Sequence, residues 1–131
     1  MSQEIAQQWL DESANTANTN NLNDHMNLIS KRVALTGVPG FDSIGYDDWF
    51  AQCQHEFTNH LLKSVAYKGL KLIVDSDTRI MFKTYETVTG TNNETNAQGI
   101  EVLIEKEQDG VWRLTQERVL SEQESAHDQL I

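Results

Sequence analysis

The chain has 131 residues, which fits a single domain that buries roughly two-thirds of the surface of its unfolded chain. Twenty acidic against ten basic residues give a net charge of −10, which disfavours binding to phosphate backbones and predicts no nucleic-acid partner. Cys53 is the only cysteine, so an internal disulfide is excluded.

The N-terminus has neither the basic start nor the long apolar run of a secretory signal. The apolar stretches are also far shorter than the roughly 20 residues that a membrane helix needs. We therefore expect a cytoplasmic protein without a membrane segment. No nucleotide-binding glycine loop, Gly-x-Ser-x-Gly motif or Cys-x-x-Cys pair occurs, and nothing in the sequence calls for a cofactor.

The first part of the chain predicts two helices. Apolar side chains share one side of a helix over residues 3–14. The run 15–21 is rich in Asn and Thr, which hydrogen-bond their own backbone and therefore favour a break. Asn20 or Asn21 is the expected N-cap of a second helix over residues 22–30.

A third helix gives the strongest helical signal. It follows a short extended piece at 33–35 and a loop at 36–41, and Ser43 or Asp47 is the expected N-cap. Up to residue 61, large apolar side chains recur every 3.6 residues on one face. This face comprises Tyr46, Trp49, Phe50, Cys53, Phe57 and Leu61.

After residue 63 the pattern changes to the alternation that is typical of β-strands. Four strands are predicted, over residues 65–74, 80–88, 100–104 and 112–116. Gly69 marks a bulge in the first of them, a long polar loop occupies 89–96, and Asp109-Gly110 forms a tight hairpin turn. On the last strand, alternation places Trp112, Leu114 and Gln116 opposite Arg113, Thr115 and Glu117.

This order of elements predicts an α+β fold, with three N-terminal helices packed in a curved antiparallel sheet. The domain spans residues 1–120, and residues 121–131 form a polar C-terminal tail that we expect to be loose.

Two motifs then resemble a known family. A Gly-x-Pro-Gly loop at 37–40 precedes an aromatic helix that begins Tyr-Asp-Asp-Trp-Phe at residue 46, and an Asp-Gly-Val-Trp-Arg-Leu hairpin closes the domain at 109–114. Together with the layout, they resemble the superfamily of nuclear transport factor two, SnoaL-like cyclases and ketosteroid isomerases over residues 3–120. The resemblance implies a cone with an apolar pocket at its wide end, and a homodimer through the outer face of the sheet.

The sequence departs from that family at its catalytic positions. SnoaL-like members often carry histidines on the last strand, where this chain has Gln116 and Arg118. The isomerases use a carboxylate base and a neutral acid in an apolar site, and those acids align with no particular residues here. Both departures weigh against the known reactions.

His25 and Glu86 are the candidate catalytic residues. His25 lies at the edge of the apolar face of the second helix and is placed to act as a general base, or else is a boundary histidine bonded to water or backbone. Glu86 shares strand parity with Ile80 and Phe82, so burial would raise its pKa, unless it lies in water at the pocket mouth. Arg113 and Arg118 pair either with Glu86 or a ligand carboxylate, or with surface acids.

The remaining residues expected to line the pocket are apolar, aromatic or close to the third helix's face: Met26, Tyr46, Trp49, Cys53, Glu56, Phe57, His60, Phe82 and Trp112. The alternative interpretation is that these side chains pack in an ordinary hydrophobic core and line no pocket. No metal site is expected, because His55 and His60 project from different faces of one helix, whereas zinc ligands on a helix are usually four residues apart.

Three functions follow from these patterns. The first is binding of a small, largely apolar ligand in the pocket, and the second is a proton-transfer enzyme of the isomerase, cyclase or dehydratase type. The third is a non-catalytic domain that dimerises through its sheet, because Met81, Tyr85 and Leu103 take the outward parity of the strands.

Overall fold

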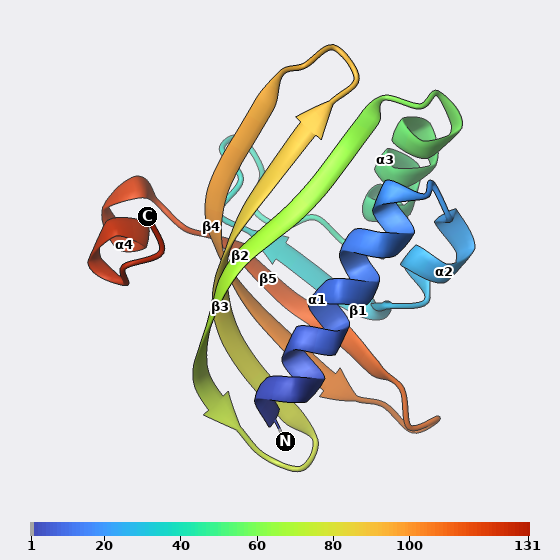
Figure 1. Cartoon of the computed structure of the whole chain (residues 1–131). Helices are drawn as coiled ribbons and strands as arrows, with labels where there is room; N and C mark the ends of the chain where they lie inside the picture. The colour runs from blue at the N-terminus through green and yellow to red at the C-terminus, as the bar shows by residue number, and fades with distance from the viewer. Residues whose placement is uncertain (1) are drawn as a thin grey trace.

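The structure is a computed structural model that describes residues 2–131. Its elements, in chain order, are α1 (Ser2–Asn18), α2 (Leu22–Met26), β1 (Ile29–Thr36), α3 (Tyr46–Thr58), β2 (Leu62–Asp75), β3 (Arg79–Gly90), β4 (Thr95–Lys106), β5 (Trp112–Val119) and α4 (Glu122–His127). The strands form one sheet in the order β1-β5-β4-β3-β2. Helices α1, α2 and α3 lie on one side of this sheet and α4 on the other (Figure 1).

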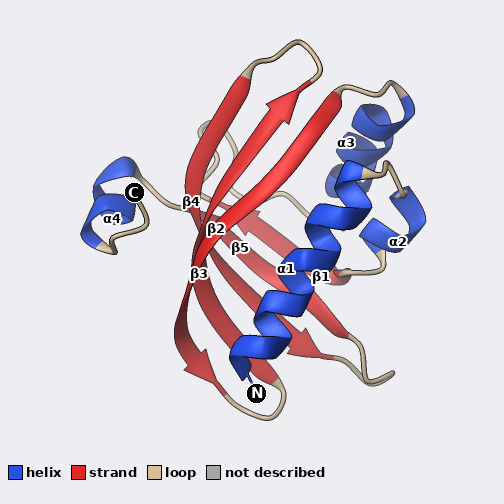
Figure 2. Ribbon diagram, in the orientation of Figure 1, coloured by secondary structure: helices blue, strands red, loops and turns tan. Residues whose placement is uncertain are grey.

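The sheet is strongly twisted, so that the upper parts of β2, β3 and β4 lean away from the lower part that underlies α1 (Figure 2). All neighbouring strands are antiparallel except β1 and β5, which are parallel. The predicted bulge at Gly69 is confirmed, because the β2–β3 register shifts between Lys68 and Lys71 and Gly69 has a φ of +78°. Bulges of this kind bend a strand and increase its twist.

The core lies between α1 and the inner face of the sheet. Apolar side chains of α1 pack onto strand residues that are fully buried. The buried core comprises Ala6, Trp9, Leu10, Met26, Leu28, Ile29, Val33, Cys53, Ile80, Phe82, Ile100, Val102, Ile104 and Leu114. The indole of Trp9 also donates a hydrogen bond to the Leu28 carbonyl at 3.2 Å, which ties α1 to the start of β1.

The second helix is shorter than predicted. It ends at Met26, and Ile29 and Ser30 belong to β1, a fifth strand where the sequence indicated only a short extended piece. The Leu28 carbonyl accepts a hydrogen bond from the Leu114 amide, so this segment pairs with β5 instead of continuing the helix. The predicted N-cap at Asn21 is confirmed, since its side chain accepts from the Asp24 amide.

The C-terminal end of α1 and both ends of α3 also differ from expectation. α1 continues to Asn18 because Thr16 and Thr19 bond back to carbonyls one turn earlier, at 2.8 Å each, instead of breaking the helix. Gly45 occupies the N-cap of α3 without a side-chain bond, so neither Ser43 nor Asp47 caps it. α3 ends at Thr58, and the loop predicted at 89–96 shrinks because β3 and β4 extend into it.

The C-terminal segment is not a loose tail. Ser121 caps α4 by accepting from the Glu124 amide, and Ser125 is buried against Gly99 of β4. Lys83 and Arg118 on the outer face of the sheet pair with Glu124, and Lys83 also pairs with Asp128 at 2.6 Å. Within residues 2–131, no helix has both the length and the apolar character needed to cross a membrane.

Candidate functional site

An inner cavity of about 120 Å³ lies between the helices and the sheet. Side chains from three helices and four strands converge on it. They are Trp9, Ser13, Ala17, His25, Ile29, Trp49, Cys53, Glu56, Phe57, Leu62, Val65, Tyr67, Glu86, Val88 and Glu117. Most of this wall is apolar, and the polar groups come from single positions on separate elements.

Glu117 is the acidic residue of this wall that the sequence pattern did not predict; Ser13 and Tyr67 are further polar residues outside the predicted set. The β4–β5 register shifts at Thr115, so Gln116 is exposed and Glu117 turns inward, against the simple alternation predicted for this strand. Glu117 is only 9% exposed, and among residues 2–131 its carboxyl group has no hydrogen bond or ion pair. Burial, together with the nearby charge of Glu86, raises its pKa well above the usual range.

Glu86 lies in a row of polar side chains across three neighbouring strands, opposite Tyr67 on β2 and Gln98 on β4. Burial raises the pKa of Glu86, and hydrogen bonds from Gln98 and Tyr67 offset part of that rise. The Gln98 amide lies 3.4 Å from Glu86 Oε1. The Tyr67 hydroxyl also lies 3.2 Å from Ser13 Oγ, and burial keeps the pKa of Tyr67 well above its ordinary value.

His25 is buried beside the cavity. Its Nδ1 lies 2.8 Å from Thr16 Oγ1, and its ring centroid is 5.4 Å from that of Phe57. Burial lowers the pKa of His25 to about 4, although a hydrogen bond with the Ser13 backbone acts in the opposite direction. At neutral pH this histidine is therefore uncharged, with one nitrogen held by Thr16.

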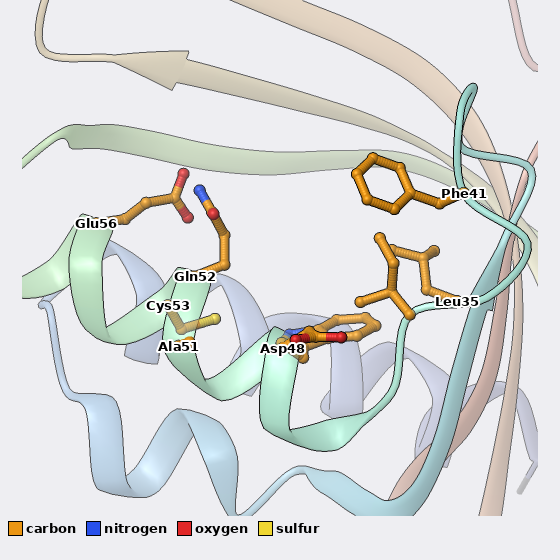
Figure 3. Close-up of a pocket in the computed structure, with 9 residues that line it drawn as sticks. Leu35, Phe41, Asp48, Ala51, Gln52, Cys53 and Glu56 are labelled. Carbon is orange, nitrogen blue, oxygen red and sulfur yellow. The ribbon is translucent and has the colours of Figure 1, made fainter.

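A second, more open cavity of about 650 Å³ adjoins the inner one. The two share Trp49, Cys53 and Glu56, which form one strip along α3. Figure 3 shows Gln52 and Glu56 projecting from α3 into the same space that Phe41 and Leu35 approach from the opposite side. The rest of the outer wall is Ile44, Asp48 and Ala51.

The structure brings six of the predicted site residues to the inner cavity: His25, Trp49, Cys53, Glu56, Phe57 and Glu86. The other five lie elsewhere. Met26 and Phe82 are buried in the core, Trp112 packs against its edge, and Tyr46 lines a separate surface hollow with Lys31 and Asp47. His60 is exposed beyond the end of α3 and lines neither cavity, because the helix stops before it.

The arginines predicted as possible partners of Glu86 are committed elsewhere. Arg118 lies on the outer face and bonds Glu124 at 2.8 Å and Glu101 at 3.2 Å. Arg113 bonds Glu107 at 3.2 Å and the Asn27 carbonyl at 2.8 Å. No Lys or Arg lines either cavity in the described part of the chain.

No protein-family model and no curated protein matches the sequence. Several solved structures are nevertheless similar to this chain in their three-dimensional fold. An NTF2-like protein of unknown function from Shewanella oneidensis is similar with a TM-score of 0.75 and 16% identity, over 91% of this chain and 98% of that one. An NTF2-like protein with a cystatin-like fold from Novosphingobium aromaticivorans is similar with a TM-score of 0.72 and 12% identity, over 99% and 88%.

A candidate scytalone dehydratase from Novosphingobium aromaticivorans is also similar, with a TM-score of 0.70 and 9% identity, over 89% of this chain and 81% of that one. At these identities the similarity establishes the fold and nothing about activity. The predicted α+β class and the predicted NTF2-like, cystatin-like architecture are thus confirmed.

Proposed function

We propose that the protein binds a small, largely apolar molecule whose polar end enters the inner cavity and whose body occupies the outer one. The observation that carries this proposal is Glu117, a residue that is 9% exposed and lines the cavity, and whose carboxyl group makes no hydrogen bond or ion pair among the described residues. Polar groups with so little exposure are normally satisfied by a bonding partner. A ligand with a hydrogen-bonding end would supply it.

The volumes support the same division of the ligand. The inner cavity of about 120 Å³ is smaller than ligand pockets of about 300–1,000 Å³, but the outer cavity of about 650 Å³ lies within that range. The strip of Trp49, Cys53 and Glu56 that the cavities share provides a continuous wall. The inner cavity therefore fits a functional group, and the outer cavity fits an apolar body.

Binding can be tested with benzyl alcohol and 4-phenyl-2-butanone as neutral probes, followed by chemical-shift changes in the protein's NMR spectrum. We expect shifts at Tyr67, Glu86 and Glu117, and their loss in a Val65→Phe variant that fills the inner cavity. Ile73→Phe is the matched control, because Ile73 is exposed on the same strand. Shifts that survive Val65→Phe, or that are confined to the molecular surface, would contradict the proposal.

Proton transfer is a second candidate function, and the pair of inward-facing acids favours it. Burial raises the pKa of both Glu86 and Glu117, which is the direction of tuning that carboxyl groups acting as general acids need. The test is exchange of the α-protons of 4-phenyl-2-butanone in D₂O. Exchange faster than in buffer, and lost in Glu86→Gln, would support catalysis; exchange at the buffer rate would leave binding alone.

Dimerisation through the sheet is a third candidate, favoured by an apolar stripe on the outer face. The stripe follows paired positions on neighbouring strands. Val74 on β2 pairs with Met81 on β3, and Met81 pairs with Leu103 on β4. Gln116 on β5 separates Leu103 from Ala34 on β1. Ion pairs flank the stripe, from Arg79 to Glu105 and from Lys83 to Glu101. We expect a dimer by light scattering that Met81→Lys dissociates and Met81→Leu preserves; a monomeric wild type would refute it.

A further inference from the structure

We propose that the ligand of the two cavities is a cationic amine, with its ammonium group held between Glu86 and Glu117 and its apolar body along α3. This inference rests on the proposed binding function and names the chemical class of the ligand. It follows from four observations: the sign of the charges in the cavities, the unpartnered state of Glu117, the fixed positions of the nearby cations, and the supply of acceptors.

The charged residues that line the cavities are all acidic. They are Asp48 and Glu56 on α3, Glu86 on β3 and Glu117 on β5. A carboxylate or phosphate ligand would bring a further negative charge into a site without a compensating cation, at a large desolvation cost. A cationic ligand instead supplies the opposite charge that this wall lacks.

The chain does not provide that cation itself. Arg118 follows Glu117 in the sequence, but it projects to the opposite face of β5 and is held there by Glu101 and Glu124. Lys83 is fixed on the same outer face by Asp128. His25, which does face the cavity, is uncharged at neutral pH because burial lowers its pKa to about 4.

The acceptors suit an ammonium group better than a metal ion. An ammonium group has three N–H donors, and the three residues Glu86, Glu117 and Tyr67, which all carry acceptor oxygens, line the same small cavity. Within residues 2–131, no three His, Cys, Asp or Glu residues are arranged to hold a metal, and hard dications require six or more oxygen ligands. Tyr67, Trp49 and Phe57 add aromatic side chains to the same wall, and aromatic rings attract cations.

The inference also fixes the direction of the pH dependence. The titratable groups that share the inner cavity with Glu117 are Glu86 on β3, Tyr67 on β2, His25 on α2, and Cys53 and Glu56 on α3. Glu117 also borders a hollow that Glu101 on β4 and Arg118 on β5 line, where these two residues pair with each other. An ammonium group favours ionised Glu117, so binding releases the proton that burial otherwise retains. Affinity for an amine therefore rises with pH through the raised pKa of Glu117, as long as the amine stays protonated.

The experiment compares three probes of one shape, which are benzylamine, benzyl alcohol and benzoate, by calorimetric or NMR titration of the full chain. We expect benzylamine to bind at least about tenfold more tightly than benzyl alcohol, as charge-assisted hydrogen bonds are about twice as strong as neutral ones. Benzoate should not bind measurably. In Glu117→Gln and Glu86→Gln the preference for the amine over the alcohol should disappear, because neutral glutamine offers no charge-assisted hydrogen bond to the ammonium group.

Glu94→Gln, at an exposed turn between β3 and β4, is the matched control and should leave the preference intact. Equal or tighter binding of the alcohol, binding of benzoate, or an amine preference that persists in Glu117→Gln would each overturn the inference while the binding function stands. If none of the probes binds, and the neutral ketone does not bind either, the proposed function fails together with the inference.

Discussion

Glu86 on β3 and Glu117 on β5 line the same cavity, although β4 lies between their strands. The curvature of the sheet brings the two carboxyl groups close enough for the charge of Glu86 to raise the pKa of Glu117. On the outer face of the same sheet the pKa of an acidic residue is lowered instead of raised, because Arg118 and Lys83 bring the pKa of Glu124 down to about 2. One face thus pairs its acids with cations, and the other leaves them for a ligand or a proton.

Glu117→Gln should stabilise the protein, and increasingly so as the pH rises. In the unfolded chain Glu117 loses its proton near pH 4.5, whereas the folded chain retains the proton to higher pH. Between these pKa values the folded state binds more protons, so its stability falls as the pH rises. Glutamine does not titrate, and we expect a gain of about 1–3 kcal/mol at pH 8 in denaturant titrations.

The control for this gain is Glu94→Gln, which removes one exposed acid of the same type. It should change the stability by less than about 0.5 kcal/mol at any pH between 5 and 8. A Glu117→Gln variant that is less stable than the wild type at pH 8 would show that the carboxylate has a partner within the folded chain.

His25 should titrate with a midpoint near pH 4 in the folded protein. Burial lowers its pKa from 6.5 to about 4, so between these values the unfolded state binds a proton that the folded state does not. The contribution of neutral His25 to the free energy of unfolding is therefore fully present above pH 6.5. It declines as the pH falls from 6.5 through about 4, by roughly 3 kcal/mol in all. The ring proton shifts of His25, assigned with His25→Gln, measure the midpoint, and a value of 6 or above would contradict this burial.

Gly99→Ala should detach α4 from the sheet. A Cβ at Gly99 would overlap the side chain of Ser125, which belongs to α4 and is buried between this helix and the sheet. We expect the amide of Ser125 to exchange with D₂O at least about tenfold faster than in the wild type, since a docked helix protects its amides. Gly45→Ala is the matched control, because a Cβ there meets no atom, and equal exchange in both variants would refute this docking contact.

The sequence predicted the fold well because the periodic patterns of α1, α3 and the four hairpin-linked strands β2, β3, β4 and β5 persist over many residues. It failed at Glu117 for a local reason. One extra residue at Thr115 reverses strand parity, and neither Gly nor Pro marks that bulge. Glu86 was placed correctly because no such irregularity interrupts the β3–β4 register.

The remaining differences come from tertiary contacts that no local pattern contains. Ile29 and Ser30 fit a helix as well as a strand, and pairing with Leu114 of the distant β5 decides between them. The polar C-terminus becomes a helix because Arg118 and Lys83 attract Glu124, and because Gly99 leaves space for Ser125. A signal for α4 was nevertheless present, since Ser121 followed three residues later by Glu124 is a capping pattern.

Cys53 should react very slowly with alkylating reagents despite lying on the strip that both cavities share. Burial, with a contribution from the charge of Glu56, raises the pKa of its thiol from 9 to about 12. The thiolate is the reactive form, so at pH 8 its population falls about a thousandfold relative to an ordinary cysteine. The rate of labelling with iodoacetamide should be at least about a hundredfold lower in buffer than in urea.

The matched variants are Glu56→Gln, which should speed the reaction in buffer, and Glu94→Gln, which should not. Labelling rates in buffer and in urea that lie within about tenfold of each other would mean that the thiol is open to solvent.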